Sequence, residues 1–387
     1  MEALSDLFSW SALALSVAGY FATLPFYRLF LYPLSRFPGP KLATASRLYE
    51  AYYDLVQDGQ YTFKIAELHK QYGPIIRISP YELHVNDPAF FDHLYRQDGA
   101  WDKYDCRQDI INRHLDKLCD RISIFTKSQE TFNFGAAITA FVRDVAFEFI
   151  LGKNYKSLDK DDFDEAMVTA TSGSGQVWRT SKHVRFIGPM FKTIPIDWLT
   201  EHGNHGTKLF FRFMKENIGD TERLVGSAKS PSRGQGQDDA VNIVHEILRS
   251  KLPESEKTTS RVFDEVATIT GAGFETTAGA LRVALFHVFD NPEILQRLRS
   301  ELATVDTRDL KVLEQLPYLK AVLMEGLRIS PALGTRMARI APDRDLLYGH
   351  WRIPAGTPVG MALVLMHMDE NLYPEPRRFN PRQVVGP

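Results

Sequence analysis

The chain has 387 residues, of which 44% are hydrophobic and 12% aromatic, enough for one large core or two ordinary domains. Its formal net charge of −2 gives no electrostatic support for nucleic-acid binding. Two cysteines, Cys106 and Cys119, are too few for a disulfide framework and indicate a reducing compartment for the folded part.

An uncharged apolar stretch, Leu7 to Phe26, opens the chain. Its twenty residues match about 30 Å of hydrocarbon when helical. Acidic residues precede it and basic residues follow it, which places the body of the protein in the cytosol. We therefore expect a transmembrane anchor over 1–30 and a proline-rich hinge over 31–41. A cleaved signal peptide is the alternative, but the acidic start, the length and the lack of a small-residue cleavage site before Pro25 argue against it.

The next segments show ordinary start and stop signals. A helix is expected over 61–72, stopped by Gly73, and a short hairpin over 75–85. Asp87 is expected to cap a helix that begins at Pro88. A long apolar helix over 132–151 ends at Gly152. A polar stretch rich in Gly, Ser and Gln over 227–239 predicts a surface loop.

A helical pattern then runs from about Phe263 to Phe289 and stops at Asn291-Pro292. It contains three glycines, at 271, 273 and 279, each costing roughly 1 kcal/mol in a helix interior. The only charge between Glu265 and Arg282 is Glu275, and two threonines follow it. Periodicity leaves two interpretations open: a site for a flat ligand beside a proton path, or a buried helix with tight packing.

Two further motifs follow this helix. Glu325 and Arg328 stand at i, i+3 on one helical face, in a helix ended by Pro331. Their apolar neighbours Leu323, Met324 and Leu327 argue against an ordinary surface salt bridge. Short strands and turns are expected next, and then the sequence Pro-Glu-Pro-Arg-Arg-Phe-Asn-Pro over 374–381.

Together, Ala-Gly-Phe-Glu-Thr-Thr over 272–277, Glu-x-x-Arg over 325–328 and the 374–381 stretch resemble the cytochrome P450 family, and fungal members of secondary metabolism most closely. The resemblance implies a mainly α fold with a small β-rich region over 42–387. It implies haem b, electrons from NADPH through NADPH-cytochrome P450 reductase, and a single-pass place in the endoplasmic reticulum membrane. The implied reaction hydroxylates or epoxidises an apolar small molecule, a terpenoid or polyketide.

The resemblance also implies roles for individual residues. Glu275 and Thr276 match the acid and alcohol that relay protons. Ala272 and Gly273 match the place where the helix passes over the porphyrin. Glu325 and Arg328 match a buried ion pair that locks the segment after it, and Arg336 is expected near a haem propionate.

The sequence departs from the family pattern in three places. After 101–105 it leads from Cys106 directly into 110–118, without the family's propionate-binding basic helix. The resemblance implies an arginine as the third residue of the locking cluster, and Gln383 stands at its position. Alternatively, Arg382 is that arginine. The loop Phe-x-x-Gly-x-Arg-x-Cys-x-Gly, which carries the thiolate ligand of haem iron, does not occur, and neither Cys106 nor Cys119 replaces it.

We therefore expect a P450 with its C-terminal part missing, no metal ligand, and no monooxygenase activity from the chain as written. Two alternatives remain. The chain is a catalytically dead, membrane-anchored remnant that binds a partner or an apolar ligand, or it is an incomplete gene model of an active enzyme.

Overall fold

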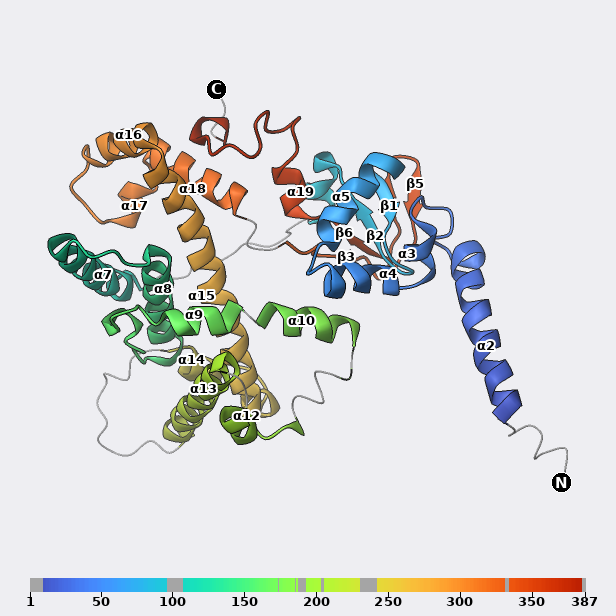
Figure 1. Ribbon diagram of the computed structural model, residues 1–387, viewed down its shortest axis with the longest axis horizontal. Helices are drawn as coiled ribbons and strands as arrows, with labels where there is room; N and C mark the ends of the chain where they lie inside the picture. The colour runs from blue at the N-terminus through green and yellow to red at the C-terminus, as the bar shows by residue number, and fades with distance from the viewer. Residues whose placement is uncertain are drawn as a thin grey trace. The chain divides into compact units, whose positions relative to one another are not determined.

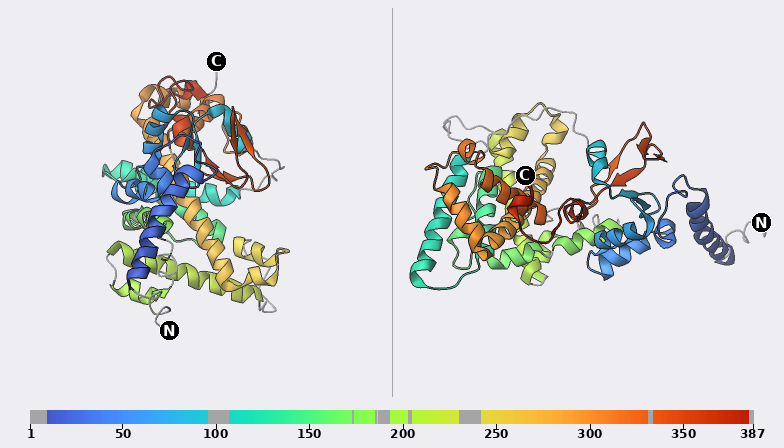
Figure 2. Two further views of the ribbon diagram at one scale, coloured as in Figure 1. Left: turned by 90° about the vertical axis from the view of Figure 1, so that its right-hand side faces the viewer. Right: turned by 90° about the horizontal axis from the view of Figure 1, so that it is seen from above.

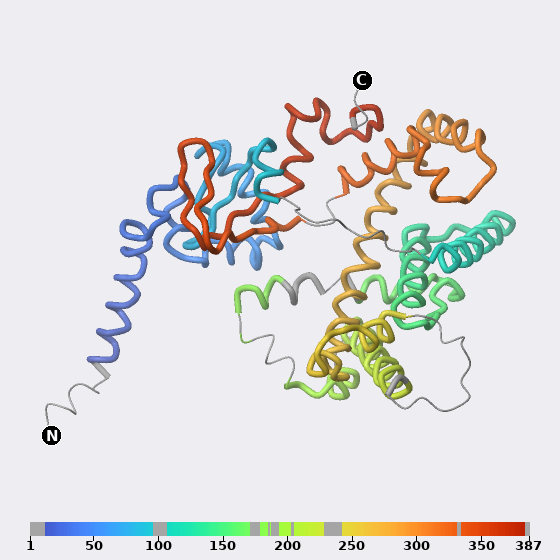
Figure 3. The backbone as a smooth tube through the Cα atoms, turned by 180° about the vertical axis from the view of Figure 1, so that it is seen from behind, coloured from blue at the N-terminus to red at the C-terminus, as the bar shows by residue number. Residues whose placement is uncertain are grey.

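A computed structural model describes residues 10–95, 107–172, 174–184, 186, 193–202, 205–229, 242–330 and 334–384. The chain divides into two compact units, and both are discontinuous in sequence (Figures 1 and 3). Unit 1 contains residues 1–100, 176–185 and 333–377, and unit 2 contains residues 101–175, 186–332 and 378–387. The 101–106 junction lies outside the described residues.

An exposed apolar helix begins the described part of unit 1 (Figures 1 and 2). It consists of α2 (Trp10–Phe26) and a π-helical turn, η1 (Tyr27–Leu31). Its stretch Ala12–Leu31 has 20 residues and a mean hydropathy of 1.3, and none of it is buried. By length and composition this helix is able to cross a bilayer. The candidate span ends at Leu31, one residue after the anchor predicted over 1–30.

A four-stranded sheet forms the centre of unit 1, in the order β1–β2–β6–β3. Strands β1 (Ile75–Arg77) and β2 (Leu83–Val85) are antiparallel, so the expected hairpin is confirmed. Strand β6 (Pro358–Gly360) joins β2 in parallel, with Leu83 opposite Val359, and β3 (Arg339–Ile340) pairs with β6. A second hairpin consists of β4 (Leu346–Tyr348) and β5 (Trp351–Ile353).

Short helices complete unit 1. The expected helix is α5, with the predicted bounds and with Gly73 at a φ of +96° after its end. The Asp87 side chain accepts a hydrogen bond from the Ala89 amide at 3.0 Å, as predicted for a cap. A helical turn at Leu363–His367 replaces the strands and turns expected there. The helices are α3 (Lys41–Ala45), α4 (Leu48–Ala51), η2 (Tyr52–Val56), α5 (Tyr61–Tyr72), η3 (Pro88–Phe90), α6 (Phe91–Leu94), α19 (Leu363–His367) and most of α10 (Ser174–His183).

All the regular secondary structure in the described residues of unit 2 is helical, and α15 runs through its middle (Figure 1). Its core joins α8 to α15 through apolar side chains such as Phe147, Val266 and Phe274. The helices are α7 (Gln108–Ser128), α8 (Phe134–Leu151), η4 (Ser157–Asp159), α9 (Glu165–Ser172), α12 (Ile196–His202), α13 (His205–Lys229), α14 (Ile243–Arg249), η5 (Glu254–Lys257), α15 (Thr259–Asp290), α16 (Pro292–Leu302), α17 (Leu310–Leu313), α18 (Pro317–Ile329) and η6 (Pro381–Val384).

Most helix ends in unit 2 follow the sequence signals. Gly152 follows α8 with a φ of +67°, and the Asn291 side chain accepts from the Ile294 amide at 3.3 Å before α16. One expectation was wrong at its start: α13 continues to Lys229, so Ser227 is helical rather than part of a loop. The fold is mainly α with a small β-rich region, as predicted.

Candidate functional site

The glycine-containing stretch lies in the middle of α15, one uninterrupted helix. Residues spaced at i, i+4, such as Val266, Thr270 and Phe274, are buried against unit 2. Gly271, Ala272 and Gly273 are exposed. A Cβ at either glycine would meet no atom within 4 Å. The backbone of α15 is therefore open to a ligand here, which favours the ligand interpretation of the glycines over tight helix packing.

Glu275 and Thr276 follow directly on the same helix. A carboxylate oxygen of Glu275 lies 3.5 Å from an Nη atom of Arg282, and both side chains are partly exposed. The Thr276 hydroxyl donates to the Ala272 carbonyl at 2.8 Å, and Thr277 does the same to Gly273. Each hydroxyl oxygen keeps lone pairs that can accept from water or a ligand. The arrangement places an acid beside an alcohol that is able to hold a water molecule.

Arg282 is a residue of this site that the sequence reading missed. Its other Nη atom lies 3.2 Å from the Thr139 hydroxyl on α8, so the guanidinium is held between α8 and Glu275. The spacing of Glu275 and Arg282 could have predicted their contact, because residues at i, i+7 lie two helical turns apart on one face.

The second predicted cluster lies on α18. Glu325 and Arg328 form two hydrogen bonds, of 2.7 and 2.8 Å, and their side chains are 0% and 2% exposed. The neighbours that argued for burial in the sequence, Leu323, Met324 and Leu327, are themselves about half exposed. The ion pair is buried because it lies on the other face of α18, together with the buried residues Ala321, Val322 and Gly326.

This ion pair holds the segment 378–383. One Glu325 oxygen accepts from the Asn380 amide and from the Gln383 side chain, each at 2.8 Å. Arg328 donates to the Arg378 carbonyl at 3.3 Å. Gln383 therefore contacts the carboxylate that the family arginine would contact, but through one neutral donor instead of a charged fork.

Arg336 lies in unit 1 and is already occupied by acids. Its guanidinium donates to Glu82 at 2.8 Å and to Glu50 at 2.7 Å, and it lies over the Tyr61 ring. Burial would lower the pKa of Arg336, but Glu82 and Glu50 outweigh burial and raise it. Its role at a haem propionate stays a prediction. The neighbouring Arg339, on β3, is exposed and donates to the carbonyls of Met337 and Ala338.

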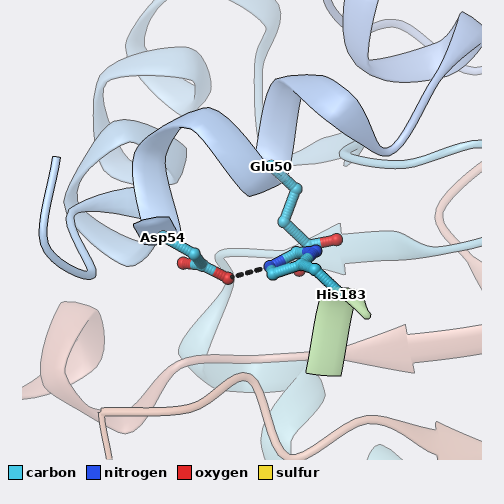
Figure 4. A group of neighbouring side chains, drawn as sticks. All are labelled: Glu50, Asp54 and His183. Atoms are coloured by element: carbon cyan, nitrogen blue, oxygen red, sulfur yellow. Dashed lines mark hydrogen bonds and ion pairs between the residues drawn. The ribbon is translucent and has the colours of Figure 1, made fainter. Parts of the chain in front are cut away.

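The same network contains a group with metal-ligand chemistry. Atoms of Glu50, Asp54 and His183 lie within 4.8 Å of one another, and His183 contacts Asp54 at 2.8 Å (Figure 4). Lys182 lies 2.5 Å from Glu50 and 3.0 Å from Asp54. Burial alone would raise the pKa of Glu50, but Arg336 and Lys182 lower it to about 2. Protein cations thus already neutralise both carboxylates, so the group is a structural charge network.

Cys119 does not fit a thiolate-bound haem. Cys119 is exposed on α7, whereas an iron ligand must face an enclosed cofactor. Cys106 lies outside the described residues. The open backbone at Gly271 and Gly273 fits a flat group, but the described residues offer no enclosed thiolate opposite it. We therefore derive no chemical step through haem.

Comparisons with known proteins agree with this fold and these motifs. The sequence model of the family Cytochrome P450 matches residues 106–383. Cytochrome P450 monooxygenase MO6277 of Ascocoryne sarcoides is 33% identical over 422 residues, covering 94% of this chain and 80% of the relative. N-acetyltryptophan 6-hydroxylase ivoC of Emericella nidulans is 31% identical, covering 97% of this chain and 81% of the relative. A zebrafish cytochrome P450 structure with progesterone has a TM-score of 0.57 at 18% identity, covering 83% of each chain, and shows the fold alone.

The chain belongs to the cytochrome P450 family. Membership implies haem, a redox partner reductase and a small-molecule substrate, with monooxygenation as the family-level function. The alignments run over more positions than the 387 residues of this chain, so the relatives carry inserted residues within the aligned region. The family match begins at residue 106, next to the junction where the sequence pattern breaks.

Proposed function

We propose that this protein is a membrane-anchored member of a fungal monooxygenase line that hydroxylates or epoxidises an apolar small molecule of secondary metabolism. The observation that carries the proposal is the helix α15, where an open glycine stretch lies beside Glu275 and Thr276 in a chain of this family. In this proposal Glu275 supplies protons and Thr276 holds the water that delivers them. Ala272 and Gly273 line the face of the flat cofactor.

The names of the relatives point to more than one class of substrate. Two of them are hydroxylases of tryptophan or N-acetyltryptophan, and another is a conidiogenone synthase. We retain a terpenoid or polyketide as the proposed substrate. The apolar helix at the N-terminus supports a single-pass anchor in the endoplasmic reticulum, with the body in the cytosol beside an NADPH-dependent reductase.

The test is the ferrous carbon-monoxide difference spectrum of the 387-residue chain in membranes. We expect no thiolate-haem band, because neither cysteine lies in the haem-loop motif and Cys119 is exposed on α7. A band that Cys106→Ser or Cys119→Ser abolishes would contradict this expectation and assign the substituted cysteine as ligand. A second spectrum, of the chain extended by the genomic sequence after codon 387, tests the enzyme itself. A band there that is accompanied by substrate turnover supports the monooxygenase.

A second candidate is a catalytically inactive binding protein. The exposed apolar side chains Leu323, Met324 and Leu327 on α18 favour it, because a patch of this kind often marks a contact surface. If the genome holds no haem loop in frame after codon 387, this candidate replaces the enzyme.

A further inference from the structure

Two buried histidines meet in the core of unit 1. His84 lies on β2, the strand between β1 and β6, and it is 0% exposed. His69 lies on α5, which packs against the same sheet (Figure 1). Nε2 of His69 is 2.7 Å from Nδ1 of His84, and Nδ1 of His69 is 2.7 Å from the Gly73 carbonyl oxygen. The second ring nitrogen of His84, Nε2, is buried and makes no hydrogen bond to any described residue.

These contacts determine where the hydrogens of the neutral pair lie. A carbonyl oxygen accepts hydrogen bonds and cannot donate one, so Nδ1 of His69 carries a hydrogen and donates it to Gly73. The other nitrogen of a neutral imidazole is an acceptor, so His84 must donate to it through its own Nδ1. The neutral pair therefore leaves the bare Nε2 of His84 as a buried acceptor.

A proton that this pair takes up must end in one place. The contact with Gly73 keeps one hydrogen, and the contact between the two rings keeps a second, whichever ring donates it. The third hydrogen therefore lies on Nε2 of His84, where the described residues offer no acceptor. The protonated pair combines a buried positive charge with an unsatisfied donor, and both raise the free energy of the folded state.

The face of the sheet around His84 offers no negative charge of its own to offset this. Ile76 on β1 and Gly360 on β6 stand opposite His84 in the ladder, and neither residue titrates. The remaining core on this side is apolar apart from phenol groups, which carry no charge in acid. These phenols belong to Tyr49, Tyr53, Tyr61 and Tyr72.

The nearest charged side chain makes protonation harder. Burial, His69 and the positive charge of Arg336, in this order, lower the pKa of His84. Arg336 is held there by its hydrogen bonds to Glu82 and Glu50. The two acids are thus already paired with a cation, and the guanidinium repels a second positive charge on the ring.

Water reaches Nε2 of His84 only if β2 separates from its neighbours. The ladder between β2 and β6 is short, with pairs at Leu83–Val359 and at His84–Gly360. His84 is thus itself part of this ladder, and its ring packs against α5 through His69. Rehydration of the ring must therefore disturb both contacts, that of β2 with β6 and that of β2 with α5.

We propose that His69 and His84 form an acid-operated clasp, in which proton uptake separates β2 from β6 and from α5 and opens unit 1 locally. Burial lowers the pKa of His69 as well. Because both folded-state values lie below the usual 6.5, the open state binds more protons than the closed state below pH 6.5. The clasp is thus fully closed above pH 6.5 and weakens as the pH falls. It goes beyond the proposed function, because it involves neither haem nor α15.

The test is hydrogen–deuterium exchange of the full chain in lipid nanodiscs at pH 7.5 and 5.5, with each rate divided by the intrinsic chemical rate. One histidine that is protonated in the open state alone raises the opening equilibrium about tenfold over this range, and two raise it about a hundredfold. We expect a rise of about a hundredfold for amides of β2, β6 and α5, with no comparable rise in α15. An equal rise in α15, or no rise in β2 and β6, would overturn the clasp.

Variants assign the effect to the two rings. His84→Asn keeps an amide donor near the position of Nδ1 but does not titrate, so the rise should fall to about tenfold. His69→Asn keeps a donor for the Gly73 carbonyl and should cause the same fall. His114→Asn is the matched control, because His114 is a buried histidine of α7 in unit 2, and it should leave the rise unchanged.

A hundredfold rise that persists in both His84→Asn and His69→Asn would overturn the proposal, and so would an equal fall in His114→Asn. The comparison of β2 and β6 with α15 in the native chain needs no variant, so it decides the matter even if a substituted chain does not fold. The pH range lies above the usual pKa of 4.5 for Glu50, so loss of charge from that carboxylate does not contribute.

Discussion

Two buried carboxylates, Glu325 in unit 2 and Glu50 in unit 1, are neutralised in contrasting ways. Glu325 pairs with Arg328 one turn away on the same helix and then accepts from residues 380 and 383. Glu50 pairs with Lys182 and with Arg336, which is 286 positions away in sequence. The first charge is balanced as soon as α18 forms, whereas the second is balanced only after distant segments meet. Glu325 therefore depends on one cation, whereas Glu50 keeps a second cation when the first is removed.

The largest expected effect comes from Arg328→Met, which leaves Glu325 buried without a cation. We expect a loss of about 3–5 kcal/mol in the free energy of unfolding. Guanidinium denaturation of the full chain in detergent, followed by circular dichroism, measures it. The double variant Glu325→Gln with Arg328→Met removes both charges and should recover most of the loss. Equal losses in the single and double variants would show that packing, not charge, dominates.

A smaller loss is expected from Arg336→Met, because Lys182 remains on Glu50. We predict a loss of about 2–3 kcal/mol in the same denaturation experiment. Arg336→Lys keeps the charge but loses the planar fork that reaches Glu50 and Glu82 together, so its loss should be intermediate. A loss larger than that of Arg328→Met would mean that Lys182 does not neutralise Glu50 when Arg336 is absent.

Acid should weaken the Glu50 network. The pKa of Glu50 in the folded protein is about 2, below its ordinary value of 4.5. Its charge therefore stabilises the fold above about pH 4.5, by on the order of 3 kcal/mol, and this stability is lost as the pH falls toward 2. The difference in unfolding free energy between the native chain and Glu50→Gln should shrink steadily from pH 5 to pH 3. A difference that stays constant over this range would contradict the lowered pKa.

The smallest effect is expected from Gln383→Ala. It removes one neutral hydrogen bond to Glu325 while the Asn380 amide and Arg328 remain. We expect a loss of about 0.5–1.5 kcal/mol. Arg382→Ala, at the exposed neighbouring position, is the control and should change stability by less. If the two variants lose the same amount, Gln383 does not contribute through Glu325.

Local signals in the sequence predicted much of this fold. Gly73 and Asn291 mark helix ends where the structure has them, and the i, i+3 spacing of Glu325 and Arg328 predicted their contact. These features depend on backbone conformation and on neighbours within one helical turn. A sequence displays such information directly.

Contacts between distant residues were not predictable in the same way. Nothing in the spacing of Glu50, Lys182 and Arg336 connects them, because they meet only after their segments fold together. The expectation for Arg336, a haem propionate, came from the resemblance alone, and its contacts with Glu50 and Glu82 were not predicted. A cavity between α13 and α15 was also missed, because its walls come from two helices that are separated in the sequence.

The parallel pairing of β2 with β6 has a consequence for synthesis of the protein. Leu83 leaves the ribosome about 275 residues before its partner Val359. At about 5–20 residues per second, translation needs roughly 15–55 s to deliver the partner strand. During that time one edge of β2 has no native partner, and an unpaired edge is a template for aggregation. Unit 1 thus has an interval on the ribosome during which a chaperone would have to cover that edge.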